Sequence, residues 1–446
     1  MNAGLSPDAR RAYADGFVRT LAGQEHAPSW LVSARKDAFD IFMEKGWPTT
    51  KQEDWRFTDV GPLTRLELLP AAIPSTVPEG AFDESLFHLG RGVGHRMVFV
   101  DGHYLLGHEA GLPPPRGLAM ASLATAIHDE SKQIGRVLGH HLQSLDAFTA
   151  LNAAFMTDGA FVQIPAGLVV EAPIFLVFLA AAEGSASFPR TVVVAGAGSQ
   201  ATLVEIHLGA DGRATLSDAV TEILLEPGAR LAYHSVEKFS ARGFHIGHLA
   251  VTQKAGSVFF AHSLVLDGQL VRNDAHVVLA EENCACQLDG VYLAAGGCHI
   301  DNQTSIDHRA PKCRSRESYR GVVSDHGQAV WSGRAIVRPG AQGTDARQSN
   351  RNLILADGAV VHSKPHLEIF ANDVKCSHGA TTGRLDPEAL FYLRSRGIGE
   401  KEANQILIAA FLRDGLGGVA DPALRGELEG ILANRTRDLI LEGAAP

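Results

Sequence analysis

Cysteine is scarce in this chain: the five cysteines among 446 residues are an odd and small number. A disulfide framework would need more of them, so the sequence indicates a reducing compartment. Residues 1–20 lack the apolar segment of a signal peptide, and we expect a cytoplasmic protein. The most apolar stretch, residues 164–182, is broken by two prolines and a glutamate, so we expect no membrane span and no membrane partner.

Charge and enzyme motifs are also sparse. Charged residues make up 20%, and acids outnumber bases by 50 to 40. The densest basic group, Arg314, Arg316 and Arg320, is interrupted by Glu317, so we expect no nucleic-acid partner. No glycine is followed by lysine, which excludes a phosphate-binding loop of the GxxxxGK[ST] type. The patterns GxSxG and HExxH are missing as well, and we expect a protein that is not an enzyme.

What is present begins with helical patterns at the two ends. Ser6 followed by Pro7 is typical of a helix start, and residues 29–43 carry apolar side chains at helical spacing. Prolines make residues 61–135 irregular, with a short helix expected within 123–138. These features predict an N-terminal helical and mixed domain over residues 1–135.

The other end starts with a helix signal at Asp386, Pro387 and Glu388, which supply a cap, a first-turn proline and a first-turn acid. Two more helices are expected over 399–416 and 421–441. Together they predict a compact C-terminal helical domain over residues 385–446.

Between these ends, over residues 136–384, strand patterns dominate. In residues 202–208, for example, apolar and polar side chains alternate with the period of two that strands require. Turns with small residues precede several strands, many about 30 residues apart, at Gly198, Gly228, Gly256, Gly327 and Gly358, with Asn283 as a further candidate. A period near 30 without intervening helices favours the stacked coils of a β-solenoid, and a β-sandwich of antiparallel sheets is the alternative.

The sharpest local motif is Cys376-Ser377-His378-Gly379, which follows a strand-like run. In an extended chain, Cys376 and His378 point to the same face, and thiol and imidazole are both suitable ligands for iron or zinc. Two ligands do not complete a four-coordinate site, so the rest would come from elsewhere in the chain or from a partner. The alternative is a packed thiol and a hydrogen-bonded core histidine.

The remaining cysteines give weaker signals. Cys284 and Cys286 can present two thiols on one strand face, although a buried structural pair is the commoner arrangement. Cys298 and Cys313 have no partner at the spacing of a zinc site.

Residues 373–398, which read DVKCSHGATTGRLDPEALFYLRSRGI, resemble the C-terminal signature of the SufD members of the SufB/SufD family. Further matches, among them IDH at 306–308, SRE at 315–317, YRGV at 319–322 and QSNRNL at 348–353, continue the resemblance upstream. Near the N-terminus, residues 53–59 (EDWRFTD) are similar to the acidic–tryptophan motif of the same family. The resemblance spans about residues 45–440 and is densest from 304 to 398.

This resemblance implies a mostly-β fold: a right-handed parallel β-helix with helical domains at either end. It implies a scaffold subunit for iron–sulfur cluster assembly that pairs with a SufB-type scaffold and binds a SufC-type ATPase through the C-terminal helices. It further implies that a transient iron–sulfur cluster forms at the partner interface, with His378 as the metal ligand and Cys376 as a second candidate. No cofactor is expected to stay bound to the isolated chain, and a homodimer remains possible.

A function of another class is a polysaccharide lyase or hydrolase, because such enzymes also use parallel β-helices. It would need paired carboxylates in a groove, for which Asp301 and Asp307 are candidates. This alternative leaves the helical C-terminus and the Cys376-Ser377-His378 motif unexplained.

Overall fold

The computed structural model describes residues 5–23, 27–66, 68–74, 76–78, 80–105, 111–129, 134–135, 137–142 and 145–442, with side chains up to residue 437. The outer ends of the two expected terminal domains, at residues 1 and 446, lie outside the described residues. Within the described residues, no helix combines the length and the apolar character needed to cross a membrane.

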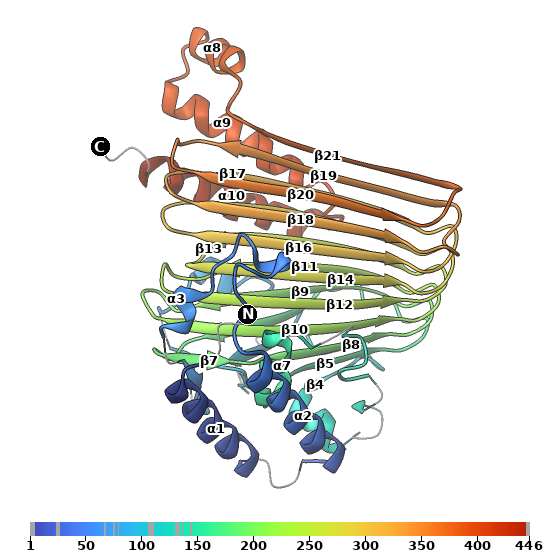
Figure 1. Cartoon of the computed structure of the whole chain (residues 1–446). Coiled ribbons are helices and arrows are strands. Elements are labelled where there is room, and N and C mark those ends of the chain that lie inside the picture. The colour runs from blue at the N-terminus through green and yellow to red at the C-terminus, as the bar shows by residue number, and fades with distance from the viewer. Residues whose placement is uncertain are drawn as a thin grey trace.

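Two sheets form the body of the protein, and their strands pair in parallel except for β3 and β4, which are antiparallel to β2 and β5 (Figure 1). Sheet 1 contains, from one end to the other, β20 (Val360–Ile369), β18 (Gln328–Val337), β16 (His299–His308), β14 (Leu270–Leu279), β12 (Phe244–Gln253), β10 (Thr215–Leu225), β8 (Arg190–Ala195), β5 (Gly159–Ile164) and β4 (Ala119–Ser122). The short strands β7 (Ser185–Ser187) and β1 (Leu69–Pro70) pair beside β10.

Sheet 2 contains β21 (Val374–Gly383), β19 (Thr344–Ile354), β17 (Arg314–Val323), β15 (Ala285–Ala294), β13 (Val258–Asp267), β11 (Arg230–Lys238), β9 (Gln200–Gly209), β6 (Ile174–Ala180), β2 (His95–Val100) and β3 (His103–Tyr104). From β8 to β21 the long strands alternate between the sheets, and each pairs in parallel with the strand two places further along the chain. The pairs from β5/β6 to β20/β21 make eight coils. The expected parallel β-solenoid is therefore confirmed, and its continuous parallel pairing contradicts the antiparallel sandwich.

The turns that precede the sheet 2 strands form one corner of the solenoid. The residues Gly198, Gly228, Gly256, Asn283, Lys312 and Gly343 all take positive φ angles there, between 60° and 73°. Gly327 and Gly358 instead precede β18 and β20 of sheet 1. The turns that the sequence grouped into one series of about 30 residues therefore belong to two different corners. The turn that follows Asn283 in this corner is at Lys312, which the sequence does not reveal, because a lysine with a positive φ angle has no characteristic sequence signal.

The space between the sheets is filled by side chains that form the main core. Two tyrosines lie there against glycines of the neighbouring coil: Tyr319 pairs with Gly290, and Tyr292 pairs with Gly321. A Cβ on Gly290 would lie 2.2 Å from the Tyr319 ring, and one on Gly321 would lie 2.0 Å from the Tyr292 ring. The missing side chains at Gly290 and Gly321 are what make room for the two rings.

The N-terminal region covers the first coils. Its helices are α1 (Pro7–Ala22), α2 (Ser29–Lys45), η1 (Glu53–Trp55), α3 (Gly61–Thr64), α4 (Glu84–Phe87), α5 (Leu123–Asp129) and α7 (Ala147–Phe155). The Ser6 side chain caps α1 by accepting a hydrogen bond from the Ala9 backbone N–H, which confirms the predicted helix start. Helices α1, α2 and α7 share an aromatic cluster, in which Phe17 and Phe39 stack 4.2 Å apart. Strand β2 pairs with β6, and strand β4 pairs with β5. This region therefore supplies the strands at the first end of both sheets.

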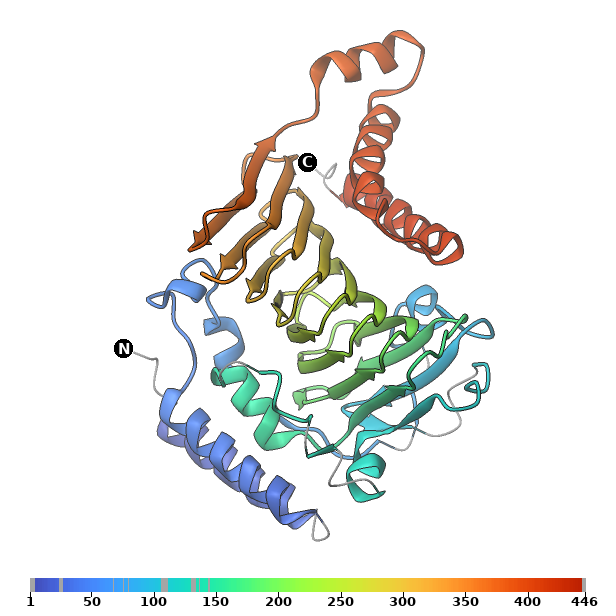
Figure 2. The same ribbon diagram turned by 90° about the vertical axis from the view of Figure 1, so that its right-hand side faces the viewer.

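The C-terminal region contains α8 (Pro387–Ser395), α9 (Glu400–Arg413), η2 (Asp414–Leu416) and α10 (Pro422–Glu442). Figure 2 shows α9 and α10 along the flank of the solenoid rather than across its last coil. Leu412, Leu416 and Leu428 from this region are buried with Val291 and Val322 of the outer face of sheet 2. Helix α8 stands apart and has no buried residue. The three expected helices are therefore present, but they perform two different structural tasks.

Candidate functional site

Cys376 and His378 lie on β21, the last strand of sheet 2. In the parallel ladder, Cys376 pairs with Ala346 and His378 pairs with Gln348 of β19. Ala346 and Gln348 are both buried side chains on the inner face of sheet 2. Since parallel pairing stacks like faces, Cys376 and His378 share the inner face of the last coil, as alternation along the strand predicted.

In the part of the chain that the structure describes, no further coil covers this inner face. There, β20 pairs only with β18 and β21 only with β19, so they are the final strands of their sheets. His378 is exposed, although the equivalent side chain in the coil below is buried. On the neighbouring strand and just after it, Ile369 is 42% exposed and Phe370 is 58% exposed. We call this surface, made of β20, β21 and Phe370, the open end.

Cys376 is more enclosed than His378. It is half-buried and packs against a small cluster of Val337, Ala341 and Ala371 at the corner of the last coil. Burial raises the pKa of the Cys376 thiol, so its thiolate form is disfavoured at neutral pH. The two side chains thus differ: His378 is exposed to solvent, whereas Cys376 is packed against its neighbours and only partly exposed to solvent.

Among the described residues, no group of three or more His, Cys, Asp and Glu side chains is arranged to hold a metal ion. His378 and Cys376 are therefore at most part of a coordination sphere within the described chain. A tetrahedral site at this position needs at least two further ligands.

The acidic–tryptophan motif, residues 53–59, runs along the outer face of sheet 1, and we call it the strap. Thr58 donates a 2.5 Å hydrogen bond to Asp301 of β16. Glu53 forms an ion pair with Lys364, and Phe57 stacks on His362 at 4.1 Å, both on β20. The strap therefore links the N-terminal region to the strand that forms one side of the open end.

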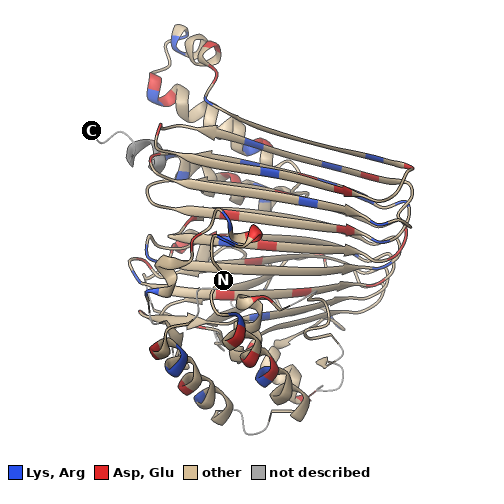
Figure 3. Ribbon diagram, viewed as in Figure 1, with Lys and Arg blue, Asp and Glu red and all other residues tan. Residues whose placement is uncertain are grey.

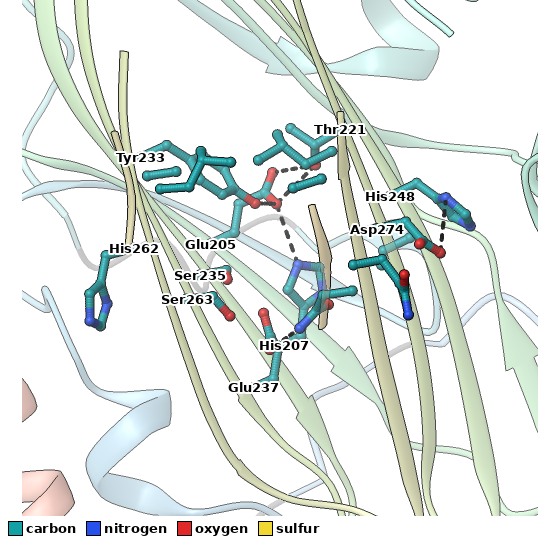
Figure 4. Close-up of a pocket in the computed structure, with 18 of the residues that line it drawn as sticks. Glu205, His207, Thr221, Tyr233, Ser235, Glu237, His248, His262, Ser263 and Asp274 are labelled. Atoms are coloured by element: carbon teal, nitrogen blue, oxygen red, sulfur yellow. Dashed lines mark hydrogen bonds and ion pairs between the residues drawn. The ribbon is translucent and has the colours of Figure 1, made fainter. Parts of the chain in front are cut away.

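A polar cluster that the sequence analysis missed lies deeper between the sheets, around a cavity of about 50 Å³ (Figure 4). The Glu205 carboxylate accepts hydrogen bonds from Tyr233 at 2.7 Å and from Thr221 at 2.9 Å, and His207 lies 3.4 Å away. Burial raises the pKa of Glu205, but its bonds to His207 and Tyr233 outweigh that effect and leave it lowered. His207 lies on β9 with Glu205 and shares its face, whereas Thr221 and Tyr233 come from β10 and β11 of the next coil, so the sequence pattern alone does not reveal the whole cluster.

The other four cysteines are buried. Cys284 lies 3.2 Å from the Lys254 carbonyl oxygen and 3.1 Å from that of Glu281, and Cys313 lies 3.3 Å from the same Glu281 oxygen. A hydrogen bond with Cys313 lowers the pKa of the Cys284 thiol below its usual value. Cys284 therefore associates with Cys313 of the next coil, and all four of these cysteines belong to the solenoid core.

The two carboxylates of the alternative hypothesis are both engaged in ion pairs. Asp301 is 1% exposed and bonds Arg272 at 2.5 Å. Asp307 is fully buried and contacts Arg309 and Arg338, each at 2.8 Å. Burial raises the pKa of Asp307, but its two arginine partners outweigh that effect and hold it below its usual value. Neither carboxylate has the environment of a general acid.

Comparison with known proteins gives the family of the chain. A family model described as the SufBD protein N-terminal region matches residues 10–176, and one described as SUF system FeS cluster assembly, SufBD core domain matches residues 178–411. An iron–sulfur cluster assembly SufBD family protein of Synechocystis is 30% identical over 418 residues, which cover 92% of each chain.

The iron–sulfur cluster assembly protein SufD of Escherichia coli is 26% identical over 419 residues, covering 93% of this chain and 92% of that protein. SufD of Bacillus subtilis is 24% identical over 416 residues, covering 89% and 92%. These matches confirm the resemblance carried by residues 373–398 and by the strap motif. The chain belongs to the SufB/SufD family of iron–sulfur cluster assembly proteins.

Proposed function

We propose that this chain is a non-catalytic scaffold subunit that pairs with a SufB-type subunit through its open end and binds a SufC-type ATPase through its C-terminal helices. A transient iron–sulfur cluster is the cargo of the pair, and His378 is the ligand that this chain contributes. Cys376 takes a secondary part beside it. The isolated chain is expected to hydrolyse neither ATP nor polysaccharide.

The observation that carries the pairing proposal is the contrast between the two ends of the solenoid. At the first end the final strands, β3 and β4, are short, pair antiparallel and belong to the N-terminal region with its helices. At the last end the long strands β20 and β21 pair in parallel and have no further sheet neighbour among the described residues. Exposed edge strands offer unpaired N–H and C=O groups to another chain, and proteins normally cover or blunt them. The edge of β20 and β21 combines unpaired backbone groups with the exposed apolar side chains of Ile369 and Phe370. Another protein can therefore bind there by adding strands to the sheets and covering these side chains.

A partner of the same family fits this edge best because it would bring a solenoid of matching strand spacing. Parallel solenoid strands lie about 4.8 Å apart, so two such ends can join without a change of geometry. Charge does not oppose the contact: Lys and Arg are interspersed with Asp and Glu across the visible strands (Figure 3). Joining would place His378 at the boundary, where ligands from both subunits can complete a metal site.

Helix α8 supports the ATPase proposal. Phe391 is 73% exposed and Tyr392 is 57% exposed on this helix. Two neighbouring aromatic side chains on a helix without buried residues make an apolar surface of the kind that enters a groove on another protein. Helices α9 and α10, which cover sheet 2, would hold α8 in place.

Two matched double substitutions test both contacts in one experiment. The chain is co-expressed with a SufB-type and a SufC-type protein, purified by a tag on this chain, and analysed by native mass measurement. Ile369→Asp/Phe370→Asp is expected to lose the SufB-type partner while keeping the ATPase. Phe391→Asp/Tyr392→Asp is expected to do the reverse.

Each double variant serves as the folding control for the other. If both variants retain both partners at wild-type levels, the open end and α8 are not the contact surfaces, and the proposal is wrong. The wild-type chain measured alone shows whether the open end also joins two copies in a homodimer.

Deletion of residues 386–446 would test the ATPase contact less specifically than the α8 substitutions. Without α9 and α10 the deletion uncovers the apolar outer face of sheet 2, including Val291 and Val322. Loss of the ATPase in that variant would therefore be accompanied by loss of stability, which the α8 substitutions avoid.

A further inference from the structure

Beneath His378, the inner face of sheet 2 carries a polar column that runs away from the open end. His378 of β21 pairs with Gln348 of β19, and Gln348 pairs with Glu317 of β17. Both lower residues are buried, with exposures of 4% for Gln348 and 3% for Glu317. Three polar side chains from three successive coils are thus stacked at the spacing of a parallel ladder, about 4.8 Å per step.

The lower end of this column is held in place by hydrogen bonds. Gln348 Nε2 donates to Glu317 Oε2 at 3.2 Å, and Thr304 Oγ1 donates to the same oxygen at 3.1 Å. Glycine at position 333 leaves space for the carboxyl group, because a Cβ there would lie 2.7 Å from Glu317 Oε2. The Gln348 amide is therefore anchored through its nitrogen.

The oxygen of the Gln348 amide is buried. Among the described residues, no group donates a hydrogen bond to Gln348 Oε1. An unsatisfied buried carbonyl costs about 1–3 kcal/mol, so a donor in reach stabilises it. The side chain directly above is His378, whose imidazole always carries at least one N–H.

We propose that Gln348 is a positioning residue for His378: its Oε1 accepts a ring N–H of the imidazole, and Glu317 fixes the amide in the orientation that allows this. This inference rests on the proposed function, in which His378 is a cluster ligand at the open end. The bond selects one tautomer and one ring orientation. The second ring nitrogen then keeps its lone pair and points toward the partner surface.

The chemical benefit follows from how histidine binds metals. A ligating imidazole usually donates its other N–H to an oxygen acceptor, which fixes the ring and raises its basicity. The acceptor that Gln348 offers one coil below His378 is an amide oxygen, so the ring is oriented without placing a charge beside the ligand. Removal of such a supporting group usually costs about 10–100-fold in metal affinity or activity.

The test uses the full chain labelled with ¹⁵N at histidine, and two-bond ¹H–¹⁵N spectra that report the tautomer of each ring. The His378 signals are assigned by their loss in His378→Ala. In the wild type His378 is expected in a single tautomer, and in Gln348→Met, which has similar length but no acceptor, it is expected to show the tautomer mixture of a free imidazole. Ser349→Ala, the next residue on β19, is the matched control and is expected to keep the wild-type spectrum.

A swap variant separates hydrogen bonding from packing. Glu317→Gln/Gln348→Glu keeps an amide paired with a carboxyl and keeps an acceptor at position 348, so it is expected to retain the single tautomer. The proposal is overturned if wild-type His378 already shows the free mixture, if Gln348→Met keeps the wild-type spectrum, or if the swap loses it together with Gln348→Met.

A cell-based arm connects the spectrum to cluster assembly. With both partners present, Gln348→Met is expected to lower cluster formation by about tenfold or more, and Ser349→Ala is expected to leave it unchanged. Normal assembly by His378→Ala would refute the proposed function while leaving the tautomer result standing. Normal assembly by Gln348→Met beside a defective His378→Ala would refute the positioning role alone.

Discussion

Arg272 of β14 lies over the indole ring of Trp55, with its guanidinium carbon 3.8 Å from the ring centroid. The same side chain donates a 2.9 Å hydrogen bond to the Asp54 carbonyl oxygen and pairs with Asp301. A buried cation over an aromatic face contributes about 2 kcal/mol when it is removed from water. This contact fixes the strap at its centre, and the strap then reaches β20.

Trp55→Ala is expected to lower the free energy of unfolding by about 3–5 kcal/mol, because a buried tryptophan and its cation–π contact are both lost. It is also expected to increase amide hydrogen exchange in residues 360–369, because Glu53 and Phe57 contact that strand. Denaturant unfolding and hydrogen exchange by mass spectrometry measure the two effects. Tyr392→Ala, an exposed aromatic substitution, is the control; unchanged exchange in β20 would contradict the role of the strap.

His378→Ala is expected to leave the fold and both partner contacts intact while lowering cluster formation in cells that depend on this chain. The imidazole is exposed at the open end, so its removal leaves no cavity in the core. Cys376→Ser is expected to have the smaller effect, because the thiol is partly enclosed by Val337, Ala341 and Ala371. Activity of an iron–sulfur enzyme in a strain lacking the natural subunit is the measurement. A larger defect in Cys376→Ser than in His378→Ala would reverse the assigned roles.

Gly290→Ala and Gly321→Ala are expected to destabilise the solenoid by about 1–3 kcal/mol each, since the added methyl group meets a tyrosine ring in a neighbouring coil. Gly426→Ala in α10 makes the same chemical change where nothing lies within 4 Å of the new Cβ. That control is expected to be neutral or stabilising by about 0.5–1 kcal/mol, as for glycine in a helix interior. Urea unfolding compares the three variants; equal effects would show that the rings do not depend on these glycines.

Stability is expected to depend on pH through Glu317. Burial raises the pKa of this carboxyl to about 8 in the folded chain, against 4.5 for the free group. The folded state therefore binds more protons between these values, and stability falls as pH rises from about 4.5 to 8. Glu317→Gln removes the titration and is expected to gain stability relative to the wild type across this window, by up to a few kcal/mol, about 1.4 per pKa unit. A difference between the two proteins that stays constant from pH 5 to pH 8 would contradict this assignment.

Features controlled by neighbouring residues could be predicted from the sequence. Ser6, Asp386 and Pro387 act as helix starts as expected, since a cap and a first-turn proline act within one turn. The shared face of Cys376 and His378 also followed from alternation along one strand. The Tyr319–Gly290 contact and the stack of His378 on Gln348 did not, because they depend on register between strands about 30 residues apart. That register depends on the number of residues in each coil. This number cannot be read from the sequence where a turn, such as the one at Lys312, has no recognisable turn residue.

The contact between Glu53 and Lys364 joins residues that are 311 positions apart in the chain. Translation at about 5–20 residues per second separates the synthesis of the two by about 15–60 s. Throughout that interval the acidic end of the strap has no β20 to bind, and Phe57 has no His362 to stack on. The strap and the last coil can thus be joined only after all the preceding coils have been synthesised, so their contact is among the last to form in the solenoid.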